Sequence, residues 1–283
     1  MYVGARNNDT ARGGRMARLL RGNEHPSLNF ISVIQSKSLN LYLKIFICNT
    51  YMMNSLQRMG TDYGGWVIDK VMHLNQESIV YSGGVGEDIS FDLLLSHEYN
   101  PWIVLIDPTK RAIDHFECLR DHYTAGQHNL PEIVSNEYKS IIQSTNPHFD
   151  KFIYEPVGLW SENKLLMFYE PINKAHVSHT FIPDMYDKSG MVDVPACTIK
   201  SLMMKHGHTH IDLLKIDIEG SEIEVINNML DDNIFPTYLC IEFDLFLKRK
   251  DPHNLTKTCI ERILQNGYTL VHNENMNITF KRG

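Results

Sequence analysis

The chain has 283 residues, of which 43% are hydrophobic and 22% are charged, and its formal net charge is −7. Such a composition is ordinary for a soluble globular protein with a full hydrophobic core. The negative charge disfavours nucleic acid and anionic membrane surfaces as partners, so a small molecule or a carbohydrate is the expected ligand.

The cysteines and the N-terminal segment indicate in which cellular compartment the protein is expected. The five cysteines are widely spread and include no Cys-x-x-Cys pair, which predicts reduced thiols in a cytoplasmic protein rather than a disulfide framework or a zinc site. No segment is apolar enough to span a membrane, since the best candidate, residues 30–48, is interrupted by Lys37 and Lys44. The first 22 residues contain five arginines and one acid, as a transit peptide does, although we favour a disordered basic tail.

A regular alternation of expected strands and helices begins only after the first 60 residues or so of the chain. We expect residues 1–60 to form an N-terminal extension that is partly disordered or helical, with one or two helices over 28–59. Beyond it, expected strands are 78–82, 102–106, 152–157, 165–169, 211–217, 238–243, 268–272 and 278–281, and expected helices are 88–97, 111–122, 198–206, 219–230 and 254–265. Residues 123–150 are expected to be less regular, and 170–191 to form an inserted loop.

Alternation of strands and helices predicts a mostly parallel sheet covered by helices on both faces. The last two strands are too close in sequence for a parallel crossover, which needs about a dozen residues or more, so they are expected to form an antiparallel hairpin. We therefore expect one α/β, Rossmann-like domain over residues 61–283.

A glycine-rich loop follows the first strand of this domain. Gly83, Gly84 and Gly86 precede a helix, and glycines there allow the backbone to approach a ligand closely. About twenty residues on, Asp107 ends the second strand, where a carboxylate can accept hydrogen bonds from ribose hydroxyls. Together these features predict a nucleoside-containing cofactor.

The residues after the loop indicate which cofactor. The third glycine of a dinucleotide fingerprint falls at Ile89, and Glu87 and Asp88 lie where a pyrophosphate would meet the helix N-terminus. S-Adenosylmethionine lacks a phosphate and carries an ammonium and a sulfonium, so acids beside the loop favour it over NAD. Simple helix capping is the alternative role for both acids.

A second motif, residues 213–222, is an apolar run that ends in alternating acids. Asp217 and Glu219 lie two residues apart, so if the strand continues they share a face with Lys215 at the carboxyl edge of the sheet. An ordinary strand-to-helix turn, with acids favoured at the helix N-terminus, is the alternative. Lys215 either pairs with Asp217 or only stabilises the sheet.

These segments together resemble the FkbM family of S-adenosylmethionine-dependent methyltransferases. The similar segments are 80–92, 107–109, 158–160, 168–171, 176–179 and 215–222, with Glu242 on the next strand. The resemblance spans about residues 60–282 and departs most at the doubled glycine and in the N-terminal region.

The resemblance implies a class I methyltransferase fold, with a seven-stranded, mostly parallel sheet whose last strand is antiparallel. It also implies O-methylation of a hydroxyl on a sugar or a small natural-product-like acceptor. The cofactor-binding positions expected on this basis are Ser82, Gly83, Gly84, Gly86, Asp88, Asp107, Pro108, Gly158 and Asp217.

Carboxylates supply the expected catalysis. Asp217 and Glu219 are candidates to orient or deprotonate the acceptor, and Glu242 can point into the same crevice. Clustered carboxylates raise one another's pKa, which brings a base closer to the working pH. Three acids also suit Mg²⁺ or Ca²⁺, but we expect no metal site.

Histidines offer a further metal alternative. His206, His208 and His210 precede a strand and are expected on a solvated loop at the opposite sheet edge, whereas His176 and His179 lie in the insertion and are expected in a polar loop. Two other functions remain as alternatives, a non-catalytic Rossmann-like binding domain and an NAD-dependent oxidoreductase. Loss of the third glycine and the acidic loop disfavour the latter.

Overall fold

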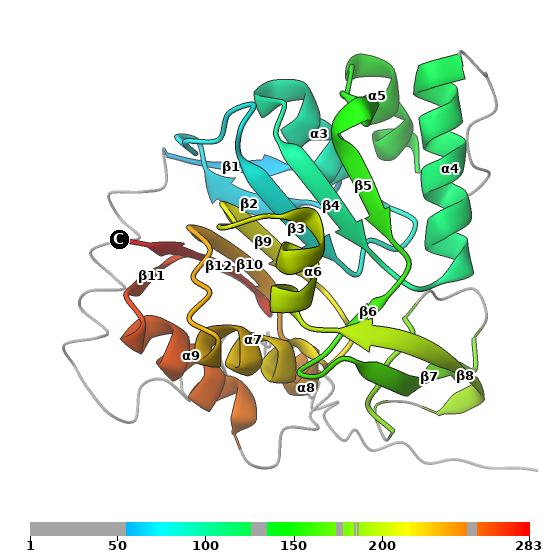
Figure 1. The fold of residues 1–283 in the computed structure, drawn as a ribbon. Helices are drawn as coiled ribbons and strands as arrows, with labels where there is room; N and C mark the ends of the chain where they lie inside the picture. The colour runs from blue at the N-terminus through cyan, green and yellow to red at the C-terminus, as the bar shows by residue number, and fades with distance from the viewer. Residues whose placement is uncertain (1–54, 126–134, 174–177, 184, 186, 248–253) are drawn as a thin grey trace, which may run out of the picture.

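The computed structural model describes residues 55–125, 135–173, 178–183, 185, 187–247 and 254–283 (Figure 1). In chain order its elements are β1 (Leu56–Met59), β2 (Trp66–Asp69), β3 (Ile79–Gly83), α3 (Ser90–Tyr99), β4 (Trp102–Ile106), α4 (Lys110–Ala125), α5 (Asn136–Ser144), the 3-10 helix η2 (Phe149–Lys151), β5 (Phe152–Glu155), β6 (Gly158–Leu159), β7 (Lys164–Pro171), β8 (Lys188–Cys197), α6 (Ile199–His206), β9 (Leu213–Ile216), α7 (Glu222–Asp231), β10 (Tyr238–Glu242), α8 (Asp244–Leu247), α9 (Leu255–Gln265), β11 (Tyr268–Glu274) and β12 (Asn277–Arg282).

The central sheet has seven strands in the order β11-β12-β10-β9-β3-β4-β5. Strands β10, β9, β3, β4 and β5 pair in parallel, whereas β12 is antiparallel to both β10 and β11. The predicted parallel sheet with a reversed last strand is therefore confirmed. The order changes direction at β3, and in open α/β sheets ligands bind beyond the carboxyl ends of strands at such a point.

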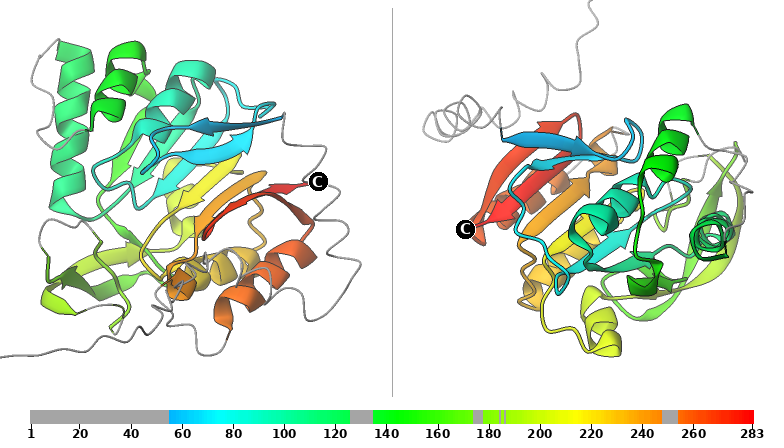
Figure 2. Two further views of the ribbon diagram at one scale, coloured as in Figure 1. Left: turned by 180° about the vertical axis from the view of Figure 1, so that it is seen from behind. Right: turned by 90° about the horizontal axis from the view of Figure 1, so that it is seen from above.

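Helices cover both faces of the sheet, as predicted (Figure 2). Alternate residues of β3 belong to different cores: Tyr81 is part of the core that includes residues of α6, α7 and α9, whereas Val80 is part of the core that includes residues of α3, α4 and α5. Because both faces are covered, strands such as β3, β4 and β9 are almost entirely buried, which explains their continuous apolar character.

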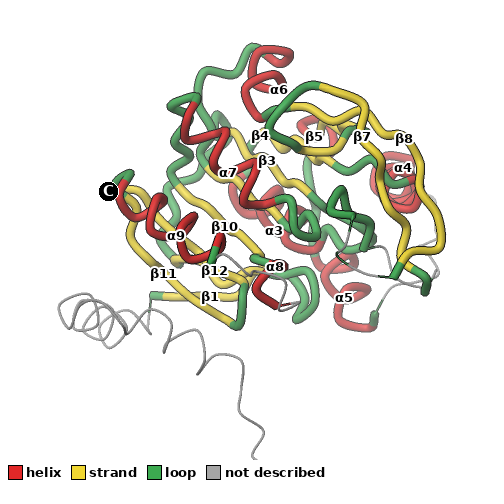
Figure 3. The backbone as a smooth tube through the Cα atoms, turned by 90° about the horizontal axis from the view of Figure 1, so that it is seen from below, coloured by secondary structure: helices red, strands yellow, loops and turns green. Residues whose placement is uncertain are grey.

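The first described strands form a hairpin that the sequence did not indicate. Leu56–Met59 pairs antiparallel with Trp66–Asp69, and Thr279 Oγ1 on β12 donates a 2.7 Å hydrogen bond to the Val67 carbonyl. Figure 3 shows β1 beside the β11–β12 end of the sheet. The helical prediction is thus wrong for residues 56–59, because Met59 and Trp66 complete the core beside α3. Residues 1–54 lie outside the described chain, and the division at residue 60 stays a prediction.

Two further predictions need correction. Residues 136–144 form α5, where Ser135 caps the helix by accepting the Tyr138 N–H and buried Tyr138 contacts α4 through His115. Within the region 170–191 that was expected to be a loop, β8 begins at Lys188 and pairs with β7, which makes a separate sheet in the order β6-β8-β7. Exposed Met191 and Val192 gave β8 no alternating apolar pattern.

Candidate active site

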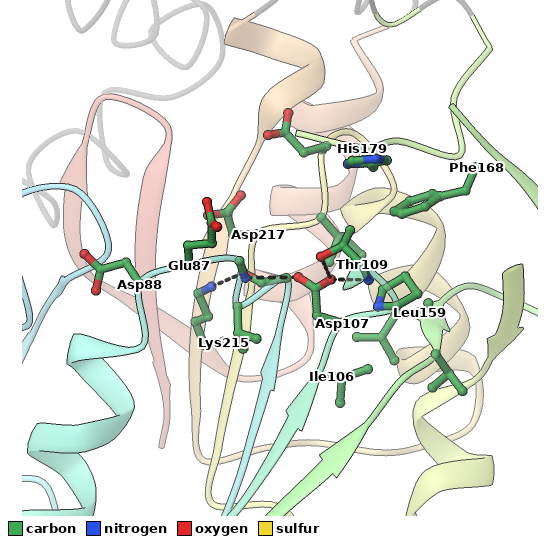
Figure 4. A pocket seen from close by; sticks show the side chains of 18 of the residues that line it. Glu87, Asp88, Ile106, Asp107, Thr109, Leu159, Phe168, His179, Lys215 and Asp217 are labelled. Atoms are coloured by element: carbon green, nitrogen blue, oxygen red, sulfur yellow. Dashed lines mark hydrogen bonds between the residues drawn. The ribbon is translucent and has the colours of Figure 1, made fainter. Parts of the chain in front are cut away.

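A cavity lies beyond the carboxyl ends of β3, β4 and β9 (Figure 4). Its wall is formed by the glycine loop 84–88, the segment 106–109, the segment 157–159 and the turn 215–219, and it is covered by Tyr63, Gly64, Phe168, His179 and Phe181. Its volume of about 90 Å³ is small compared with the roughly 300–1,000 Å³ of pockets for drug-sized ligands.

The glycine loop is fixed by close packing against Asp217 and by a hydrogen bond from Lys215. Gly84 has φ +70°, and a Cβ there would come within 1.6 Å of the Asp217 carbonyl oxygen, so only glycine fits. Lys215 is buried and its Nζ donates a 2.7 Å hydrogen bond to the Gly84 carbonyl. Lys215 therefore fixes the loop, which neither interpretation of its role had anticipated.

Asp107 is positioned by several donors. Its Oδ1 accepts hydrogen bonds from the Thr109 N–H at 2.8 Å and the Thr109 hydroxyl at 2.7 Å, and its Oδ2 accepts the Gly86 N–H at 3.0 Å. A carboxylate has about four acceptor positions, so this one keeps capacity for a further donor. Asp107 thus ties the end of β4 to the glycine loop while it lines the cavity.

The two acids after the loop are already engaged within the protein. Glu87 forms an ion pair with Arg111 of α4. Asp88 Oδ1 accepts the N–H of Ser90, the first residue of α3, at 2.9 Å, and its Oδ2 accepts the Thr61 hydroxyl at 2.6 Å. Asp88 thus serves the helix start, the alternative that the sequence left open, although it also lines the cavity.

The acidic motif forms a turn rather than a longer strand. Strand β9 ends at Ile216, and Glu219 and Gly220 both have positive φ values, of 56° and 102°. The expectation that Asp217 and Glu219 share one face of a strand is therefore wrong. The turn nevertheless places both residues on the cavity wall, because it folds back over the end of the sheet.

Buried Glu222 closes this turn from the inside. Its Oε1 accepts the N–H of Ile218 at 3.1 Å and that of Gly220 at 2.9 Å. From the outside, the Thr180 hydroxyl donates a 2.6 Å hydrogen bond to the Glu219 carbonyl. Desolvation raises the pKa of Glu222 to about 8, so its side chain is mainly protonated at neutral pH.

Asp217 and Glu242 interact with each other, and desolvation is the largest cause of the raised pKa of each. Desolvation, followed by the negative charges of Asp217 and Asp244, raises the pKa of Glu242 to about 9. Burial likewise raises the pKa of Asp217, opposed by the Lys215 charge and by a hydrogen bond from Glu242. The protonated Glu242 therefore donates to Asp217 at neutral pH, in line with the predicted raising of pKa among clustered acids.

Most of the predicted site residues meet at the cavity. The wall includes Gly84, Gly86, Asp88, Asp107, Pro108, Gly158, Asp217 and Glu219. Ser82 and Gly83 belong to β3 below the loop, and Glu242 contributes through Asp217 rather than as part of the wall. The roles assigned to these residues stay predictions.

Several wall residues were not found from the sequence. Phe168, Phe181 and Tyr63 come from separate segments that only the tertiary structure brings together. Phe181 packs on Phe168 with a centroid distance of 4.7 Å, and a Cβ on Gly158 would come within 2.3 Å of the Phe181 ring. Gly158 was the one local signal, because a glycine marks a close approach.

The histidines that suggested a metal have other partners. His206 Nε2 lies 2.7 Å from Glu155 Oε1, and His208 Nδ1 lies 2.9 Å from the Tyr81 hydroxyl. His179 stacks on Phe168 at the cavity, and His176 lies outside the described residues. Within the described ranges no three or more His, Cys, Asp or Glu side chains are grouped as metal ligands.

Comparisons with known proteins place this geometry in context. A family model, the methyltransferase FkbM domain, matches residues 99–270, which is more than half of the chain. Comparison with curated proteins and with solved structures gives no match. In the described part of the chain, every helix is too short or too polar to cross a membrane.

Proposed function

The chain belongs to the FkbM family of methyltransferases, and on that premise we propose that it transfers a methyl group from S-adenosylmethionine to a hydroxyl of a sugar or a small natural-product-like molecule. The observation that carries the proposal is the cavity itself, in which a glycine loop, Asp107 and the turn with Asp217 meet beyond the carboxyl ends of three strands. The strand order, with only the last strand reversed, is the one expected for a class I methyltransferase.

The residues present fit a cationic nucleoside cofactor without phosphates. Gly84 lines the cavity and lets the glycine loop lie directly on the backbone of Asp217, and Asp107 retains acceptor capacity for ribose hydroxyls. Asp217 and Glu219 give the wall a negative character that repels a pyrophosphate. The Phe181 ring lies against Gly158 and closes one side of this cavity.

When bound, S-adenosylmethionine supplies an electrophilic methyl group on a sulfonium. The work of the protein is then to position the acceptor and to receive its proton. Asp217 is the proposed base, because its carboxylate lines the cavity and has a raised pKa, and Glu219 orients the acceptor hydroxyl. Glu242 holds its own proton toward Asp217 and so keeps one oxygen of that carboxylate in a fixed orientation.

Cofactor binding tests the proposal directly. Isothermal titration of the full chain with S-adenosylmethionine, S-adenosylhomocysteine and NAD should show binding of the first two only. Asp107→Ala should weaken S-adenosylhomocysteine binding about 10- to 100-fold, through loss of charge-assisted hydrogen bonds. Asp114→Ala, which removes an exposed acid of α4 paired with Lys110, serves as the matched control and should bind as the wild type does.

Two outcomes would contradict this assignment. Binding of NAD alone would favour the oxidoreductase alternative. Binding of S-adenosylmethionine without methylation of any acceptor in a broad panel of glycosides and polyols would favour a non-catalytic binding domain.

A further inference from the structure

Tyr63 is the most exposed large hydrophobic residue in the described part of the chain, with 81% of its surface accessible, yet it borders the cavity. We propose that Tyr63 is a specificity-determining residue that stacks on a neutral, polyhydroxylated ring of the acceptor. In this proposal Tyr63 and Gly64, in the turn 60–65 between β1 and β2, form the acceptor-side wall of the site. The inference rests on the proposed methyltransferase function and adds a residue to it.

The turn that carries Tyr63 is firmly anchored. Thr61 is 1% exposed, its N–H donates to Ser90 Oγ at 2.9 Å, and its hydroxyl donates to Asp88 Oδ2 at 2.6 Å. The same hydroxyl accepts the Gly64 N–H at 2.9 Å, and the Thr61 carbonyl accepts the Gly65 N–H at 2.8 Å. These bonds fix the turn to the glycine loop and to α3.

Close packing leaves no room for a side chain at the three glycines of this turn. A Cβ on Gly64 would lie 2.7 Å from Asp88 Cγ, and one on Gly65 would lie 2.4 Å from the Thr61 carbonyl oxygen. Gly60 has φ +93°, and a Cβ there would lie 2.6 Å from the Gly65 Cα. The closely packed glycines therefore fix the backbone of the turn that carries Tyr63, and the fold gains little from the Tyr63 side chain because it is mostly exposed.

The surroundings of Tyr63 define the chemistry of its ligand. A tyrosine phenol is neutral at physiological pH, and Tyr63 shares the cavity wall with Asp88, Asp217 and Glu219. The aromatic ring offers a flat apolar surface, and the neighbouring carboxylates offer acceptors for hydroxyl groups. This pairing suits a neutral sugar ring, whereas a uronic acid or a sugar phosphate would be repelled by the acids.

Saturation-transfer NMR on the complex with S-adenosylhomocysteine provides the test. The probes are methyl glycosides of neutral hexoses and 6-deoxyhexoses, with methyl glucuronide as the anionic counterpart. We expect the wild type to bind at least one neutral glycoside more tightly than glucuronide. Tyr63→Ala should weaken that binding about tenfold, whereas Tyr63→Phe should retain it, since the ring and not the hydroxyl makes the contact.

The controls separate this inference from the proposed function. Asp62→Ala alters the neighbouring position, whose side chain is 92% exposed, and should leave both ligands bound as in the wild type. S-Adenosylhomocysteine affinity should be that of the wild type in Asp62→Ala, and in Tyr63→Ala it should change less than the glycoside affinity does. The proposal for Tyr63 is overturned if Tyr63→Ala binds the glycosides as the wild type does, if no neutral glycoside binds, or if glucuronide binds as tightly. Failure of S-adenosylhomocysteine to bind the wild type would instead overturn the proposed function.

Discussion

At the scale of single residues, Asp217 is the point where the loop, the acidic turn and the proton of Glu242 meet. Its backbone N–H donates to the Gly83 carbonyl at 3.1 Å, while its side chain receives a hydrogen bond from Glu242. Lys215 binds the Gly84 carbonyl and lowers the pKa of Asp217 by its charge. One residue therefore links the cofactor loop to the proposed acceptor chemistry.

Asp217→Asn should separate the two functions. An amide cannot take up the proton of the acceptor hydroxyl, so turnover should fall about 100-fold or more, in the range of general-base contributions. The backbone contact with the loop is retained, so S-adenosylhomocysteine affinity should change less than about threefold. Methylation of an acceptor glycoside and calorimetric titration measure the two effects. Equal losses in both would mean that Asp217 serves the cofactor rather than the acceptor.

Site residues could be predicted from the sequence where a local pattern indicates them. Glycines and acids that follow buried strands can be recognised because the carboxyl ends of parallel strands meet at one edge. Tyr63 and Phe181 could not be recognised in this way, because each reaches the cavity through a tertiary contact of a distant segment. The raised pKa values of Asp217 and Glu242 were predictable in direction only, since the size of each shift depends on burial.

At the scale of elements, the sequence predicted most strands of the sheet and the helices that cover it, but it extended several strands beyond their observed ends. The acidic motif shows the reason: strand β9 was expected to continue to Asp217, yet the positive φ of Glu219 turns the chain there. A left-handed glutamate is uncommon and becomes tolerable only where surrounding contacts determine it. Those contacts come from Glu222 and Thr180, which no local pattern reveals.

Replacement of Glu222 should release this turn. Glu222→Ala leaves the N–H groups of Ile218 and Gly220 without their acceptor, at a cost of roughly 2 kcal/mol or more in the free energy of unfolding. The exchange of these two amide hydrogens should also become faster. Glu222→Gln keeps an acceptor oxygen at the same place and should retain slow exchange. Denaturant unfolding and amide exchange measure both effects, and equally slow exchange in the Ala variant would show that the turn does not depend on Glu222.

At the scale of the whole molecule, the site concentrates buried carboxyl groups in a chain that is already negative, with a net charge of −7. Desolvation raises the pKa of Asp92 to about 6 and that of Glu222 to about 8, and it is the largest cause that brings the pKa of Glu242 to about 9. Groups with strongly perturbed pKa values are common at functional sites. A pKa that differs between the folded and the unfolded protein makes the free energy of unfolding depend on pH. The stability of the protein should therefore depend on pH.

The direction of this dependence follows from proton uptake. Between the ordinary glutamate pKa of 4.5 and the raised values of about 8 and 9, Glu222 and Glu242 keep their protons in the folded protein and lose them in the unfolded chain. Stability therefore falls as pH rises through this window. Burial lowers the pKa of His115 from 6.5 to about 4, so stability also falls as pH drops across that range.

We expect the unfolding temperature of the cofactor-free protein to be higher near pH 6 than near pH 9. Glu242→Gln, which cannot ionise, should reduce this difference, because one of the groups that releases a proton on unfolding in this window is removed. Glu224→Gln, at an exposed position on α7 two residues after the buried Glu222, is the control and should leave the difference unchanged. Calorimetric scans at both pH values measure the effect. An unfolding temperature that is the same or higher at pH 9 would show that these carboxyl groups are ionised, and stabilised by other partners, in the folded protein.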